Sequence, residues 1–155
     1  MADVHDKKTR SYNMSRIRGK DTKPEMIVRR FLHSKGFRYK LHDKTLPRKP
    51  DIVLPKYKTV IFIHGCFWHG HEGCKYYVVP KTRTEWWKKK ITGNRNKDIN
   101  CYEYLQKNNW NIIIVWVCDL KQAKADETLS RLPKKIHERI DGYQEFPNTN
   151  SNIVF

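Results

Sequence analysis

Four residues of the kind that bind zinc lie in and near one short segment. Cys66, His71 and Cys74 are spaced as C-x4-H-x2-C, and Cys118 follows an apolar run at 112–117. Thiolates with one imidazole suit zinc, and four such ligands leave no coordination position open for water. The pattern predicts a structural zinc site that attaches a long loop to the end of a core strand. The alternative is that Cys118 is simply buried and the other three residues are incidental.

Asp51, His64 and His69 remain once zinc has its ligands. A carboxylate with carbonyl and phosphate oxygens suits Mg²⁺, and histidines, with an ordinary pKa of about 6.5, can hold or deprotonate an attacking water. Together they would form a phosphodiesterase site. In an antiparallel pair joined at 55–58 the strand ends at Asp51 and His64 would lie apart unless the strands stagger or bend, and the sequence does not fix this register. The alternative for Asp51 is a turn residue after Pro50.

The composition points to a polyanionic partner. The chain has 155 residues, with 32 lysines and arginines against 16 acidic residues and a formal net charge of +16. Nucleic acid is favoured over a membrane surface because the basic residues are spread along the chain and form no amphipathic basic helix. No apolar run approaches the roughly 20 residues of a membrane span, and the N-terminus has no signal-type stretch. We therefore expect a cytoplasmic protein with no membrane association.

Hydrophobic spacing predicts the elements that position these residues. Thr22-Lys-Pro-Glu25 is a capping box, which by itself accounts for Glu25. Strands are predicted at 37–41, 51–54, 59–63 and 111–117, a long loop at 65–83, and helices at 23–35, 84–108 and 120–140, the last interrupted at Pro133. Cys101 falls inside a helix and should be buried without a ligand role. The order predicts an α/β domain with a mixed sheet and helices on both faces.

The chain is expected to divide into three segments. Residues 1–20 form a basic DNA-binding arm, 21–141 one folded domain and 142–155 a C-terminal tail. The arm has six basic and no acidic side chains between Lys7 and Lys20, so it should become ordered on a phosphate backbone. The alternative is an inert, solvated tail.

The sequence resembles the very-short-patch-repair (Vsr) DNA mismatch endonucleases over about residues 1–120. The resemblance lies in the strings DKKTRSYNMSRIRGKDTKPE (6–25), LPRKPDIVLP (46–55), FIHGCFWHGHEGC (62–74), VPKTRTEWW (79–87) and IIVWVCDL (113–120). It implies a restriction-endonuclease-like fold, with the endonuclease domain at 21–141. It also implies an enzyme that nicks one strand 5′ to the thymine of a T:G mismatch, which starts the repair of deaminated 5-methylcytosine.

The resemblance assigns roles to the candidate residues. Asp51 would be the principal Mg²⁺ ligand, helped by the main-chain carbonyl of Ile63, and His69 would be the general base. His64 and Glu25 would organise metal-bound water. Structural Zn²⁺ would be bound by Cys66, His71, Cys74 and Cys118. Two departures from the family pattern are Ile63, where its members have threonine, and one extra residue before Cys74.

The resemblance also implies an intercalating wedge. Phe67, Trp68 and Trp87 would enter the mismatch from the major groove and Met14 from the minor groove, whereas Trp86 would serve packing. Aromatic faces recover part of the cost of unstacking a base step, which is lowest where pairing is already faulty. The alternative is that Phe67 and Trp68 are core aromatics behind the zinc. The phosphate contacts of the arm would come from Lys7, Lys8, Arg10, Arg16 and Arg18.

Two other classes of function stay open at this point. One is a non-catalytic, zinc-stabilised nucleic-acid-binding protein, and the other is a nuclease that uses His64 and His69 on a catalytic zinc. For the favoured enzyme, the expected partners are double-stranded DNA with a T:G mismatch and mismatch-repair proteins. We expect a monomer, because cutting one strand needs no twofold partner. The expected location is the bacterial cytoplasm, in association with the nucleoid. The bases that flank the mismatch are not predicted.

Overall fold

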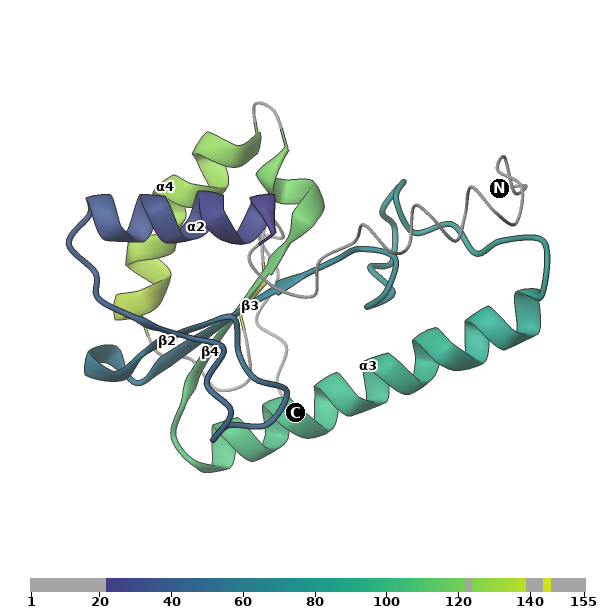
Figure 1. Cartoon of the computed structure of the whole chain (residues 1–155), viewed down its shortest axis with the longest axis horizontal. Helices are drawn as coiled ribbons and strands as arrows, with labels where there is room; N and C mark the ends of the chain where they lie inside the picture. The colour runs from purple at the N-terminus through teal and green to yellow at the C-terminus, as the bar shows by residue number, and fades with distance from the viewer. Residues whose placement is uncertain (1–21, 122–123, 139–143, 146–155) are drawn as a thin grey trace.

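The computed structural model describes residues 22–121, 124–138 and 144–145 (Figure 1). The predicted arm at 1–20, with Met14 and its cations, lies outside these residues. So does most of the predicted tail at 142–155. No helix of the described residues is long and apolar enough to cross a membrane.

A five-stranded mixed sheet forms the centre of the protein. Its strands are β1 (Lys40–Leu41), β2 (Ile52–Leu54), β3 (Thr59–His64), β4 (Asn111–Trp116) and β5 (Gln144–Glu145), in the spatial order β1-β2-β3-β4-β5. The pairs β1–β2 and β2–β3 are antiparallel, and the pairs β3–β4 and β4–β5 are parallel. The predicted mixed sheet is confirmed. The backbone of β5, within the predicted tail, forms one edge of the sheet.

Three helices cover the two faces of this sheet. In Figure 1, α2 (Lys23–Ser34) and α4 (Lys124–His137) lie on one face, and the long α3 (Thr84–Lys107) lies on the other and extends past the sheet. Val28 and Leu132 belong to the apolar core on the first face, and Tyr102 and Leu105 belong to the core on the second. Because helices cover both faces of the sheet, every residue of β4 is buried, and this explains its apolar sequence.

The first helix begins and ends as its sequence predicts. The Thr22 hydroxyl accepts the Glu25 N–H at 3.5 Å, and proline occupies the first turn. At the other end Gly36 has a φ angle of 86°, and the Phe37 N–H donates to the Leu32 carbonyl at 3.0 Å. Glycine adopts this left-handed conformation at little cost. The turn brings Phe37 back into the core.

Two predicted elements differ from the structure by more than one residue at an end. The strand expected at 37–41 is limited to Lys40–Leu41, where the chain pairs with β2. The helix expected at 120–140 begins only at Lys124, after a 3₁₀ turn η2 (Val117–Leu120), and it continues through Pro133. Leu132 and Ile136 are buried on either side of this proline, so core packing offsets the backbone hydrogen bond that proline cannot make. The predicted interruption is therefore wrong.

The expectation that Asp51 and the end of the next strand lie apart is also wrong. β2 and β3 form an antiparallel pair in which Ile52 faces Ile61. In such a hairpin the first residue of one strand and the last residue of the other are both at the open end. Asp51 therefore lies beside Ile63, whose N–H donates to Asp51 Oδ2 at 2.7 Å.

Candidate active site and metal centres

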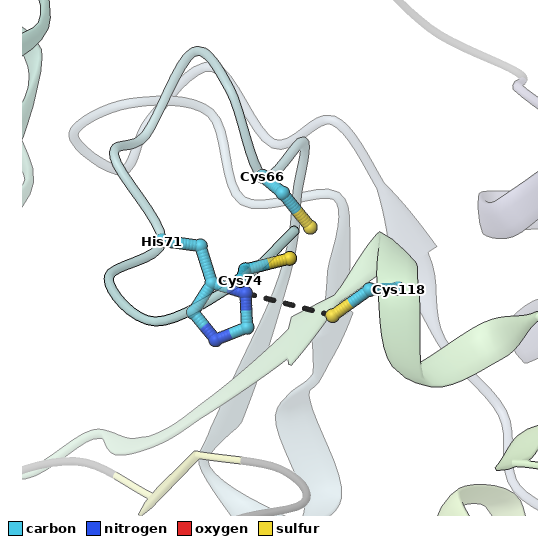
Figure 2. Close-up of side chains that lie close together, drawn as sticks. All are labelled: Cys66, His71, Cys74 and Cys118. Atoms are coloured by element: carbon cyan, nitrogen blue, oxygen red, sulfur yellow. Dashed lines mark hydrogen bonds between the residues drawn. The ribbon is translucent and has the colours of Figure 1, made fainter. Parts of the chain in front are cut away.

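The four predicted zinc ligands converge between the long loop after β3 and the turn after β4. Figure 2 shows Cys66, His71, Cys74 and Cys118 pointing toward one another, and one ligand atom from each lies within 4.8 Å of all the others. Donors at zinc bond lengths of about 2.0–2.3 Å in a tetrahedron lie roughly 3.5–4 Å apart. The distance from His71 Nδ1 to Cys118 Sγ is 3.5 Å. The arrangement and the donor types fit a four-coordinate zinc ion.

The electrostatics of this cluster also favour a cation. Burial raises the pKa of the Cys66 and Cys118 thiols, and the nearby Asp119 carboxylate raises that of Cys118 further. Neighbouring thiols of this kind resist ionisation together because their negative charges would repel each other. A bound divalent cation reverses this preference and stabilises the thiolates.

Local turns and close packing hold the loop at 65–74 against α3. The His71 N–H donates to the Cys66 carbonyl at 2.9 Å. Gly70 has a φ angle of 63°, and a Cβ at this position would lie 2.8 Å from Arg95 Cδ and 2.9 Å from Ile91 Cγ2. Both the conformation and the close packing require glycine there. The loop is therefore fixed by its packing against the helix.

A cleft of about 710 Å³ opens beside the end of β3, and two members of a second group of candidate ligands, Glu25 and Asp51, line it. Glu25, His42 and Asp51 each offer one ligand atom within 4.8 Å of the others. Burial raises the pKa of Asp51 to about 7, and the negative charge of Glu25 contributes, while the hydrogen bond from Ile63 opposes the shift. A divalent cation that prefers oxygen ligands would stabilise the ionised form of a carboxyl group in this position.

His42 is a member of this group that the sequence did not indicate. Its Nε2 lies 3.5 Å from Glu25 Oε2, and the same carboxylate oxygen pairs with Arg29 at 2.9 Å. Glu25 is 4% exposed, so these side chains take the place of water around its carboxylate. His42 lies in a connecting segment without a recognisable motif, and only the fold brings it to Asp51.

A histidine–carboxylate pair lines the same cleft. His69 Nδ1 lies 2.6 Å from Oδ2 of Asp98, a buried residue of α3. The contact fixes Nδ1 as the protonated nitrogen and leaves Nε2 able to accept a proton. Asp98 was not predicted, although it lies on the same helical stripe as the buried residues Ile91 and Tyr102. A carboxylate on an apolar helix face was the signal that could have found it.

His64 packs against the His69 ring of this pair. It is 5% exposed, its Nε2 lies 2.5 Å from the Tyr102 hydroxyl, and its ring stacks on His69 at 3.7 Å with an interplanar angle of 13°. Burial, followed by the charges of His69 and Arg48, holds the pKa of His64 well below its usual range. His64, His69 and Asp98 are close enough to share a metal. However, the in-plane lone pairs of two stacked rings do not converge on one ion, so the geometry favours acid–base chemistry.

The predicted wedge aromatics form a partly exposed cluster. The ring centroids of Phe67, Trp68 and Trp87 are 5.3–5.7 Å apart, and all three side chains are half-buried. Trp86, which was expected to serve packing, is 45% exposed. Trp86 contacts Trp87 edge-on, and the Arg83 guanidinium lies over its ring. Its neighbours therefore cover only part of it.

Comparison with known proteins places the chain in a family. Residues 2–75 match the family described as DNA mismatch endonuclease Vsr. The chain is 47% identical over 141 residues to the Type II nicking enzyme V.NmeAIP of Neisseria meningitidis, with 90% of this chain and all of that protein covered. It is 44% identical to DNA mismatch endonuclease Vsr of Escherichia coli, with 92% and 90% covered. The chain therefore belongs to the Vsr family of DNA mismatch endonucleases, which are hydrolases that cleave DNA.

Proposed function

We propose that this protein is a Mg²⁺-dependent endonuclease that nicks one strand 5′ to the thymine of a T:G mismatch. Such a nick would initiate very short patch repair of deaminated 5-methylcytosine. The observation that carries the proposal is that one cleft is lined both by the Asp51 carboxylate, a candidate metal ligand, and by the His69–Asp98 pair. Several relatives are named nicking enzymes, which supports cutting of one strand. The sheet with helices on both faces is consistent with a restriction-endonuclease-like fold.

Asp51 is proposed as the principal Mg²⁺ ligand, together with the main-chain carbonyl of Ile63. In an extended strand the N–H and C=O of one residue point toward the same side. Because the Ile63 N–H donates to Asp51, its carbonyl also faces the Asp51 side, and this role does not depend on the side chain at 63. When bound there, Mg²⁺ would stabilise charge on the phosphate oxygens. Glu25 and His64 would organise the surrounding water, and His42 is added to this set.

His69 is proposed as the general base. Its Nε2 accepts a proton from the attacking water while Asp98 holds Nδ1. The water oxygen forms a bond to phosphorus, the bond from phosphorus to one deoxyribose oxygen breaks, and that oxygen takes a proton from solvent. Tyr102 and the stacked His64 ring keep the His69 ring in place.

Zn²⁺ is proposed to have a structural role at Cys66, His71, Cys74 and Cys118. The same loop that provides three of these ligands also carries Phe67, Trp68 and His69. Binding of zinc would therefore fix the aromatic wedge and the base together. Entry of Phe67, Trp68 and Trp87 between bases would be least costly at a mispaired step, which gives preference for a mismatch.

The remaining interactions are proposed from the charge and the family. Met14 from the arm would contact the minor groove, and Lys7, Lys8, Arg10, Arg16 and Arg18 would contact phosphates. We propose that the protein acts as a monomer on double-stranded DNA in the bacterial cytoplasm, at the nucleoid, with mismatch-repair proteins as partners.

One experiment tests this function directly. A duplex library with a single T:G pair and randomised flanking bases is incubated with the zinc-loaded protein and Mg²⁺, and the nicks are mapped by sequencing. We expect cuts in the thymine strand, 5′ to the thymine, and no cuts in matched T:A duplexes. Asp51→Ala should abolish the cuts. Equal nicking by this variant would remove the catalytic assignment, and nicking that needs no Mg²⁺ would favour a catalytic zinc.

A further inference from the structure

Arg48 is a cation in the cleft that sequence analysis assigned to no role. Its guanidinium lies 3.2 Å from Oδ1 of Asp98, and 36% of its side chain is exposed. The other carboxylate oxygen, Oδ2, holds His69. Asp98 therefore connects the proposed base with a positive charge that solvent and substrate can reach.

The backbone that carries Arg48 has an unusual conformation. Arg48 and Lys49 have φ angles of 62° and 46°, in the left-handed region that residues with a Cβ rarely adopt. The Lys49 N–H donates to the Leu46 carbonyl at 3.3 Å, and the following Pro50 is buried. Strained residues of this kind persist where the surrounding structure fixes them, and they are concentrated at active sites and ligand-binding sites.

The cleft also needs positive charge to accept DNA. Glu25, Asp51 and Asp98 line it, and the DNA backbone adds a negative charge with each phosphate. A divalent cation at Asp51 would offset part of the repulsion. A guanidinium beside Asp98 would offset another part, and its planar fork matches two phosphate oxygens.

We propose that Arg48 is a catalytic residue that binds a nonbridging oxygen of the scissile phosphate, with its guanidinium positioned by Asp98. This inference rests on the proposed function of the cleft. As water attacks, negative charge builds on the phosphoryl oxygens, and a fixed guanidinium stabilises this charge more strongly than that of the ground state. Loss of Arg48 should therefore lower kcat more than it raises KM.

Steady-state kinetics on the T:G duplex tests the catalytic part. Arg48→Gln should lower kcat about 100-fold, the usual effect of removing one donor to the transition state. Arg48→Lys keeps the charge without the fork and should recover part of the loss. Lys56→Gln, at the opposite end of the β2–β3 hairpin, removes the same charge and should cut like the wild type. An unchanged kcat in Arg48→Gln would overturn the proposal.

Binding to a neutralised phosphate separates contact with DNA from an indirect role through Asp98. A methylphosphonate replaces one phosphate at a time, and affinities are measured with Ca²⁺ in place of Mg²⁺. At the scissile position the wild type should lose about tenfold in affinity, whereas Arg48→Gln, already weaker, should lose little more. If both proteins lose the same factor at every position, Arg48 contacts none of these phosphates and the proposal is wrong. A wild type that binds but does not nick T:G would instead overturn the proposed function, and the binding comparison would still decide the role of Arg48.

Discussion

The indole of Trp116 lies flat against the imidazole of His71, with 4.1 Å between ring centroids and an interplanar angle of 2°. The same indole meets His64 edge-on at 5.4 Å, and the two residues are register partners in β3 and β4. Trp116 therefore contacts His71, a proposed zinc ligand, and also His64, whose ring stacks on His69. Its buried Nε1–H has no acceptor among the described residues, so the ring is present for its contacts and not for a hydrogen bond.

Trp116→Leu should retain zinc but weaken catalysis. Removal of both ring contacts frees His64 and, through it, His69, and a small misplacement of a catalytic group can cost ten- to a hundredfold in rate. We expect kcat to fall in this range with little change in KM, while a zinc assay gives wild-type stoichiometry. Trp110→Leu is the matched control, because Trp110 precedes the other end of β4 and should affect stability alone. Equal kinetic losses in the two variants would show that Trp116 has no special connection to the site.

Asp51 should make the Mg²⁺-free protein less stable as the pH rises. Its folded-state pKa is about 7 against an ordinary 3.8, so the folded state binds the proton more tightly and stability is lost between about pH 4 and pH 7, by up to about 4 kcal/mol. Asp51→Asn removes this loss. Urea unfolding of the zinc-loaded protein should show a gain for the variant that is small at pH 5 and larger at pH 8. A gain independent of pH would contradict the burial of a charge at this position.

Asp98→Asn tests the orientation of the proposed base. The asparagine amide can donate to Nδ1 of His69, which leaves the ring proton on Nε2. Nε2 then has no lone pair to accept the proton from water. We expect kcat for the T:G duplex to fall by roughly 100-fold or more in steady-state kinetics. Glu103→Gln, an exposed change on the same helix, is the control and should cut normally. A variant with wild-type kcat would exclude Asp98 from the catalytic apparatus.

Zinc removal should release the loop that carries the proposed wedge and the proposed base. Cys74→Ser removes one thiolate, and structural zinc sites contribute binding energy of order 10 kcal/mol to folding. We expect weaker zinc retention, a lower Tm and loss of nicking, measured by a colorimetric zinc assay and by thermal unfolding. Cys101→Ser is the control, because Cys101 is buried outside the ligand cluster and its thiol donates to the Pro47 carbonyl. Full zinc content in Cys74→Ser would remove Cys74 from the ligand set.

Trp68→Ala should reduce preference for a mismatch more than affinity for a matched duplex. The Trp68 side chain has Phe67 and Trp87 as neighbours and is partly exposed, and stacking of an aromatic ring on a base contributes about 1–3 kcal/mol. Titrations with T:G and T:A duplexes should show about a tenfold loss of discrimination. Tyr104→Ala, exposed toward the other end of α3, should preserve it. Equal losses on both duplexes in Trp68→Ala would argue against intercalation.

Much of this protein could be predicted from local sequence. The C-x4-H-x2-C spacing with Cys118 predicted the group of four candidate ligands that the fold brings together, since three of its members lie on one loop and their separation is set by a few residues of chain. The capping box at Thr22 and the apolar β4 were equally local signals, because helix caps and buried strands depend on neighbouring residues. The composition pointed to nucleic acid without reference to any fold.

Tertiary structure decided which residues share the cleft. Asp98 reaches His69 across 29 positions of sequence, and Arg48 reaches Asp98 from a different connecting segment. His42 lies close to Glu25 and Asp51, and nothing in its local sequence indicated this proximity. The relation between Asp51 and the strand end at His64 was mistaken, because it follows from the direction and register of the hairpin. Contacts of this kind depend on how strands and helices pack, and side-chain type and spacing along the chain do not contain that information.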